Sequence, residues 1–127
     1  DVSEILLKEA PSQAQLIRGS ILNPGTDIGR VDCIILNEVL EHVVNIDAAL
    51  RRTFDLLNPG GLCIIIDKNK EQLGRLAIAS WEQWFDEQGL SDALTSQGFQ
   101  SVKTIRNISY DGHSGDDGLF MGWVAQR

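Results

Sequence analysis

Two continuous apolar runs separated by a helical pattern constrain the fold of this chain most strongly. The runs are VDCIILN at 31–37 and LCIII at 62–66. Apolar runs of this length without alternation are typical of strands covered on both faces, as in a parallel sheet. Between them, segment 46–57 places apolar residues at helical spacing and begins after Asn45, a natural helix cap. This order of strand, helix and strand predicts an α/β unit with a parallel strand pair.

The rest of the chain adds predicted helices and strands around this unit. Further helices are expected over 3–10, 80–88 and 90–97. Further strands are expected over 15–21, 101–109 and 118–126. The last two strands flank a polar loop rich in Gly and Asp, which is typical of an antiparallel closing edge. We therefore expect a single domain over residues 1–127, with a mostly parallel sheet, helices on both faces and an antiparallel C-terminal strand pair.

The composition is that of a globular domain with an acidic surface. The chain has 127 residues, of which 43% are hydrophobic and 23% are charged, and its net charge is −7. This charge and the lack of a basic stripe argue against binding to nucleic acid or to an anionic membrane. Cys33 and Cys63 lie inside the apolar runs, so we expect buried thiols and no disulfide. With no membrane-length apolar run and no signal peptide in the sequence, we expect a cytoplasmic location.

The stretch NEVLEHV at 37–43 places two carboxylates and an imidazole directly after the first buried strand. On a helix, Glu38, Glu41 and His42 share one face. Open α/β sheets bind ligands at the carboxyl ends of their strands, which is where this stretch lies. Three interpretations follow: a divalent metal site, an acid/base site, or a polar helix start that Asn37 caps. A zinc protease is excluded because its motif needs two histidines on the helix.

Segments 31–43 (VDCIILNEVLEHV) and 56–67 (LLNPGGLCIIID) together resemble the class I S-adenosylmethionine-dependent methyltransferases. In that family a strand with an aspartate, here Asp32, leads into a V-L-E-H-type helix, and a P-G-G turn opens the next strand. The resemblance implies a Rossmann-like doubly wound fold, S-adenosylmethionine as cofactor, and methyl transfer to a small-molecule nucleophile. The alternative is a catalytically inactive methyltransferase-like domain that serves as a scaffold or binding module.

The family's glycine-rich loop has no counterpart in this sequence, and the chain begins Asp1-Val2-Ser3 without Met. We therefore expect a piece of a longer protein, with that loop upstream of Asp1. The inactive alternative is favoured by the missing loop and by Gly19-Ser20 at a corner where the family often has an aspartate.

The resemblance implies cofactor contacts for five residues. Asp1 corresponds to the acidic residue that accepts hydrogen bonds from both ribose hydroxyls. Ser20 and Ile21 lie at the adenine corner, where a hydroxyl or a backbone carbonyl would accept a bond from the amino group. Asn37 and Glu38 face the methionine end of the cofactor.

A metal and a general base are weighed on the same stretch. The pattern of Glu38, Glu41 and His42 resembles that of ubiquinone-biosynthesis O-methyltransferases and small-RNA 2′-O-methyltransferases, which use a divalent ion. The same L-E-H occurs in family members without a metal. A further ligand is needed, and the only other histidine is His113 in a distant loop, so we expect no metal. The sequence assigns no general base, and His42 is the nearest candidate by type.

Three other segments carry weaker signals. Trp81, Trp84 and Phe85 are spaced as on one helix face, which predicts either core packing or a lid over the acceptor. Residues 67–70 (DKNK) follow the strand over 62–66 and either reach the acceptor or form a solvated loop. Residues 111–118 (DGHSGDDG) lack the ligand order of a calcium loop.

Overall fold

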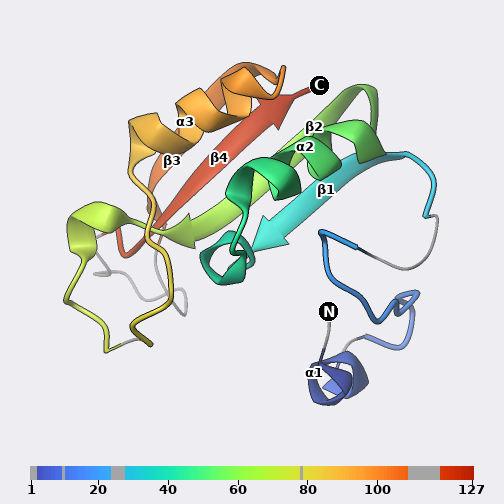
Figure 1. Cartoon of the computed structure of the whole chain (residues 1–127), viewed down its shortest axis with the longest axis horizontal. Coiled ribbons are helices and arrows are strands. Elements are labelled where there is room, and N and C mark those ends of the chain that lie inside the picture. The colour runs from blue at the N-terminus through green and yellow to red at the C-terminus, as the bar shows by residue number, and fades with distance from the viewer. Residues whose placement is uncertain (1–2, 10, 24–27, 78, 109–117) are drawn as a thin grey trace.

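The computed structural model describes residues 3–9, 11–23, 28–77, 79–108 and 118–127 (Figure 1). Its sheet consists of β1 (Val31–Asn37), β2 (Leu57–Lys68), β3 (Gln100–Ile108) and β4 (Phe120–Gln126). The strand order is β1-β2-β4-β3. β1 runs parallel to β2, whereas β4 is antiparallel to both of its neighbours. The predicted α/β class and the antiparallel C-terminal pair are confirmed, and the sheet is mixed.

The helices of the described ranges are α1 (Glu4–Glu9), α2 (Ile46–Leu56) and α3 (Glu87–Ser96), with the 3₁₀ turns η1 (Leu40–His42) and η2 (Lys70–Gln72). The helices predicted over 3–10, 46–57 and 90–97 are thus confirmed. Asn45 caps α2 as predicted, since its Oδ1 accepts a hydrogen bond from the amide of Ala48 at 3.0 Å. None of the helices in the described ranges is long and apolar enough to cross a membrane.

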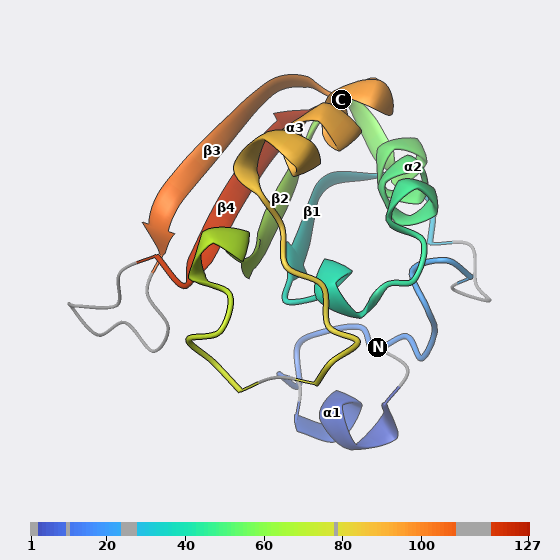
Figure 2. The ribbon, with the colours of Figure 1, turned by 60° about the vertical axis from the view of Figure 1, so that its left-hand side comes forward.

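The core lies where α2 and α3 pack together on one face of the sheet (Figure 2). Leu50 of α2, Leu94 of α3 and Trp123 of β4 are fully buried there. On the opposite face, Ile35 of β1 is 62% exposed and Leu62 of β2 is 40% exposed. Alternate residues of a strand point to opposite faces, so packing on one face buries only every second side chain.

The two cysteines differ for the same reason. Cys63 is buried as predicted, and burial, followed by the neighbouring Cys33, raises the pKa of its thiol to about 12. Cys33 is exposed, and β1 is not covered on both faces, so these two predictions are wrong.

The strand predicted over 15–21 is absent from the structure. Residues 15–18 are irregular, and the last part of the segment folds back on itself, with the amide of Asn23 bonded to the carbonyl of Ser20 at 3.0 Å. In the described residues no strand of the sheet pairs with this segment, and a short strand needs such a neighbour.

The helix predicted over 80–88 is also wrong, because the helix begins only at Glu87. The backbone groups of the residues before it form hydrogen bonds with other segments. The amide of Gln83 donates to the carbonyl of Glu41 at 3.1 Å, and that of Phe85 to the carbonyl of Lys68 at 3.0 Å. These tertiary bonds replace the ones that a helix would form.

The P-G-G turn forms a bulge near the start of β2. The register of the parallel pair shifts there, from Val31 opposite Leu57 to Cys33 opposite Leu62. A Cβ on Gly61 would lie 2.9 Å from the carbonyl oxygen of Asn58 and 3.0 Å from that of Asp32, so the close approach requires glycine. Beyond the bulge the pairing is regular and carries β2 alongside β1 to their common carboxyl end.

Candidate functional site

The carboxyl ends of β1 and β2 meet at one edge of the sheet. Asn37, the last residue of β1, pairs with Ile66. Directly after it, the amide of Glu38 donates to the carbonyl of Ile66 at 2.8 Å. Glu38 has a φ of 51°, in the left-handed region that non-glycine residues rarely adopt. Strained backbone of this kind clusters at functional sites, which makes this edge of the sheet the candidate functional site.

Lys68, the last residue of β2, lies at the centre of a group of carboxylates at this edge. We call this group the Lys68 cluster; it consists of Lys68, Glu38, Glu41 and Glu82. The Nζ of Lys68 is paired with Glu41 and lies 3.3 Å from Glu82 and 3.9 Å from Glu38. The side chain of Lys68 is only 5% exposed and that of Glu41 only 2%. Burial disfavours the ammonium, but Glu41 and then Glu82 raise the pKa of Lys68 above its ordinary value.

Glu41 uses both of its oxygens. Oε2 binds Lys68, and Oε1 lies 3.1 Å from Nε2 of His42. The imidazole of His42 is about half exposed, and its ring centre lies 5.4 Å from that of Trp81. Glu41 therefore links a buried ammonium on one side with a solvent-accessible imidazole on the other.

Asp67 is fully buried and lies next to Glu41. Its Oδ2 accepts the amides of Leu40 and Glu41 at 3.1 and 3.3 Å, so a side chain of β2 caps η1. Burial raises the pKa of Asp67 to about 7, against the lowering effect of the Lys68 amide, and the Glu41 carboxyl group raises it further. A carboxyl group with this pKa carries a proton part of the time near neutral pH.

Segment 79–86 crosses this edge as an irregular strap. Besides the two backbone bonds given above, the side-chain amide of Gln83 donates to the carbonyl of Val43 at 2.6 Å. Glu82 from the strap reaches the Lys68 cluster, and Trp81 is 65% exposed beside His42. Phe85 packs against the core, as the core interpretation predicts. The exposure of Trp81 does not fit that interpretation, and its place beside His42 fits the lid interpretation.

Four of the five residues predicted to bind the cofactor lie in the described ranges. Asn37 and Glu38 stand at the carboxyl edge, as predicted. Ile21 packs against the core, and the Ser20 hydroxyl accepts the amide of Leu22 at 3.2 Å. Asp1 lies outside the described residues. A role in cofactor binding stays a prediction for all five.

Sequence reasoning missed the partners that organise the edge. From the sequence, Lys68 and Asp67 belong to a segment that either reaches the acceptor or is solvated, and Glu82 lies on a predicted helix. The available signal was the pair of charged residues that directly follows the apolar run ending at Ile66. A buried strand that ends in an acid and a base places both at the ligand edge of an α/β sheet.

A divalent ion does not fit the described residues as they stand. Both oxygens of Glu41 are occupied, and the nearest carboxylates already surround an ammonium. Within the described ranges no group of three or more His, Cys, Asp or Glu side chains is arranged to hold a metal ion.

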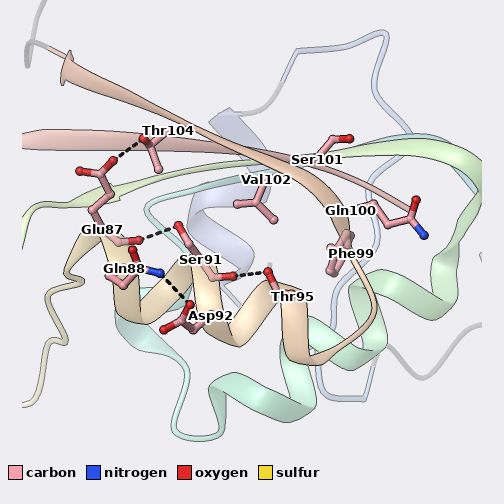
Figure 3. A pocket seen from close by; sticks show the side chains of 10 residues that line it. All are labelled: Glu87, Gln88, Ser91, Asp92, Thr95, Phe99, Gln100, Ser101, Val102 and Thr104. Atoms are coloured by element: carbon pink, nitrogen blue, oxygen red, sulfur yellow. Dashed lines mark hydrogen bonds between the residues drawn. The ribbon is translucent and has the colours of Figure 1, made fainter.

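A hollow of about 570 Å³ lies elsewhere, between α3 and β3 (Figure 3). Most of its polar side chains bond to one another or to the helix. Gln88 donates to Asp92 at 2.7 Å, and the hydroxyl of Thr95 donates to the carbonyl of Ser91 at 2.9 Å. Glu87 binds Thr104 and Arg106, which lowers its pKa. Because these polar groups already bond within the protein, this hollow is a weaker candidate for the functional site than the carboxyl edge.

Asp67 generates a prediction for the pH dependence of stability. Its carboxyl group has a pKa of about 7 in the folded chain and an ordinary value of 3.8. The folded state therefore binds the extra proton between these values, and the contribution of Asp67 to the free energy of unfolding falls as pH rises through that window. We expect the difference between wild type and Asp67→Asn, from urea denaturation, to fall between about pH 4 and about pH 7.

The matched control for the change in net charge is Asp92→Asn, at an exposed acid of α3. A difference between wild type and Asp67→Asn that stays constant or grows with pH would show that Asp67 is not held in this way.

A protein-family model matches most of this chain. Residues 7–107 match the family model described as a methyltransferase domain. The human mitochondrial ubiquinone biosynthesis O-methyltransferase is 31% identical over 99 residues, and the match covers 66% of this chain and 27% of that protein. The corresponding rat protein is 27% identical over 99 residues and is covered to 28%. The chain thus spans about a quarter of the length of these curated relatives.

Solved structures show the same fold at low identity. A SAM-dependent methyltransferase from Archaeoglobus fulgidus superposes with a TM-score of 0.80 at 12% identity, covering 100% of this chain and 74% of that one. An S-adenosylmethionine-dependent methyltransferase from Clostridium acetobutylicum gives 0.76 at 10% identity, covering 99% and 72%. With a family model that matches most of its length and a sheet of this topology, the chain belongs to the methyltransferase domain family.

Proposed function

We propose that the protein containing this chain transfers the methyl group of S-adenosylmethionine to an oxygen of a small molecule. The observation that carries the proposal is the match to the methyltransferase domain family, together with the cluster of polar groups at the carboxyl edge of β1 and β2. Oxygen as the acceptor atom is supported by the names of the human and rat relatives. The extent of the domain, residues 1–127, stays a prediction, as do the absence of nucleic acid and membrane partners.

The cofactor is assigned to the edge where Asn37 and Glu38 follow β1. Open α/β sheets bind their ligands there, and the side chains of Asn37 and Glu38 supply hydrogen-bond acceptors. Asn37 is exposed, and Glu38 is 38% exposed at its side chain, so both are accessible to a ligand. Ser20, Ile21 and Asp1 complete the proposed set.

His42 is the proposed base for the acceptor. Nε2 of His42 lies 3.1 Å from Oε1 of Glu41, and this carboxylate favours the tautomer with its proton on Nε2. In that tautomer Nδ1 is the nitrogen that can accept the proton of a hydroxyl group. S-adenosylmethionine, when bound, supplies an electrophilic methyl group. On transfer of this methyl group to the acceptor oxygen, with the carbon–sulfur bond as the one broken, His42 would take up the hydroxyl proton. Positioning the two reactants is the main contribution of the edge to the rate.

A cytoplasmic location also stays a prediction, and the mammalian relatives are named as mitochondrial.

The catalytically inactive alternative predicts a folded protein that binds no cofactor, so one titration separates the two functions.

We expect the intact protein that contains this chain to bind S-adenosylmethionine in isothermal titration calorimetry. A Kd of roughly 1 µM to 1 mM is the usual range for enzyme substrates. Asn37→Ala removes a polar contact, and Glu38→Gln replaces a charged acceptor with a neutral one; each change weakens binding by about tenfold. Asp92→Asn removes an exposed carboxylate far from this edge, in the α3–β3 hollow, and keeps the wild-type affinity.

The two parts of the proposal fail separately in this titration. A folded wild-type protein that releases no binding heat would refute the transferase and favour the inactive domain. Wild-type binding that both variants retain would keep the function and move the cofactor away from Asn37 and Glu38.

His42→Asn tests the proposed base. A phenolic hydroxyl loses its proton more easily than an aliphatic one, so catechol is a suitable probe of oxygen acceptors. We expect mass spectrometry to detect one added methyl group with the wild-type protein. Loss of a general base lowers kcat by about 10²- to 10⁴-fold, and the affinity for S-adenosylmethionine stays unchanged.

The contrary result is a kcat for His42→Asn within about twofold of wild type, far less than the loss typical of a general base. This result would remove His42 from the mechanism. Histamine, an amine of similar size, is the control for the acceptor atom, and its methylation in place of catechol would contradict transfer to oxygen.

A further inference from the structure

We propose that Lys68 is the resident cation of the Lys68 cluster. Its ammonium occupies the place that a divalent metal would take among Glu38, Glu41 and Glu82, and the cluster therefore does not bind one. In relation to methyl transfer this inference rests on the function proposed above, but its evidence and its test are independent of the cofactor.

The positions of the carboxylate oxygens carry the first step of the argument. The Nζ of Lys68 has three carboxylates within 4 Å, from Glu41, Glu82 and Glu38. Oxygen-rich surroundings of this kind suit hard divalent cations such as Mg²⁺ and Mn²⁺. An ammonium with three N–H donors can satisfy the same oxygens from the same central place.

The occupancy of Glu41 carries the second step. A metal at this position would need an oxygen of Glu41, the most buried carboxylate of the cluster. Oε2 is bound by Lys68, and Oε1 faces His42 at 3.1 Å. A metal ion could therefore enter only by displacing the ammonium or the imidazole.

The burial of Lys68 carries the third step. Its side chain is 5% exposed and lies next to Phe120, whose ring centre is 6.0 Å from Nζ. A buried ammonium that left these carboxylates would lose its compensating charges, which is costly in a poorly solvated place. Displacement of Lys68 by a metal is therefore unfavourable.

The charge balance gives a consequence for the chemistry. A single positive charge neutralises the three carboxylates less completely than a divalent ion would, so the cluster stays electronegative. This favours a cationic group at the edge, and the sulfonium of S-adenosylmethionine is one.

Electron paramagnetic resonance of Mn²⁺ tests the proposal on the intact protein that contains this chain. Free Mn²⁺ gives a strong signal that is lost on binding. We expect the wild-type protein to leave this signal unchanged up to about 1 mM, the weak end of protein affinities for hard divalent cations. A wild-type protein that binds one Mn²⁺ per chain, and loses this binding in Glu41→Gln, would overturn the proposal.

Lys68→Met supplies the second arm, because methionine keeps a long unbranched side chain without the charge. The carboxylates of Glu38, Glu41 and Glu82 are not arranged to hold a metal ion while the ammonium stands between them. We expect this variant to let them close around one Mn²⁺ per chain, and the double variant with Glu41→Gln to lose it. Lys103→Met makes the same charge change at an exposed lysine of β3 and should bind no Mn²⁺. A folded Lys68→Met that takes up no Mn²⁺ would also overturn the proposal.

Circular dichroism reports whether Lys68→Met folds. If it is unfolded and Mn²⁺ restores its folding, the ion has taken over the role of the ammonium, which supports the proposal. If it stays unfolded with Mn²⁺, the comparison of wild type with Glu41→Gln decides alone. Binding of S-adenosylmethionine enters none of these readouts, so failure here leaves the proposed methyl transfer standing.

Discussion

The buried ion pair between Lys68 and Glu41 is the interaction on which the candidate site depends. Its two side chains come from the end of β2 and from η1, and they are 5% and 2% exposed. A buried charge without a partner costs several kcal/mol, so neither residue is tolerated in this place without the other. The pair therefore fixes the 3₁₀ turn after β1 against the end of β2, which sets the shape of the carboxyl edge.

Other groups at this edge are arranged around that pair. Glu82 brings the strap into the same cluster, and Asp67 caps η1 while sharing the surroundings of Glu41. The second oxygen of Glu41 orients His42 at the surface. Lys68 thus acts on His42 through Glu41. It positions the base that we propose for the acceptor and does not contact the acceptor itself.

The sequence predicted the regular elements well where a pattern is local. The strand over 31–37, the Asn45 cap and the P-G-G turn that opens the next strand depend on neighbouring residues and were predicted. Two errors arose where distant segments decide the outcome. Segment 80–86 gives up a helix for backbone bonds to Glu41 and Lys68, and segment 15–21 has no adjoining strand in the described part of the chain. The role of Lys68 was missed for the same reason, since its carboxylate partners are brought to it only by the fold.

A double-mutant cycle on Lys68 and Glu41 tests the central claim most directly. Free energies of unfolding are measured by urea denaturation for wild type, Lys68→Met, Glu41→Gln and the double variant. If the pair is coupled as described, the double variant loses less than the sum of the single losses, by about 3 kcal/mol. Losses that add to within about 0.5 kcal/mol would show that the two residues act independently and would contradict the account.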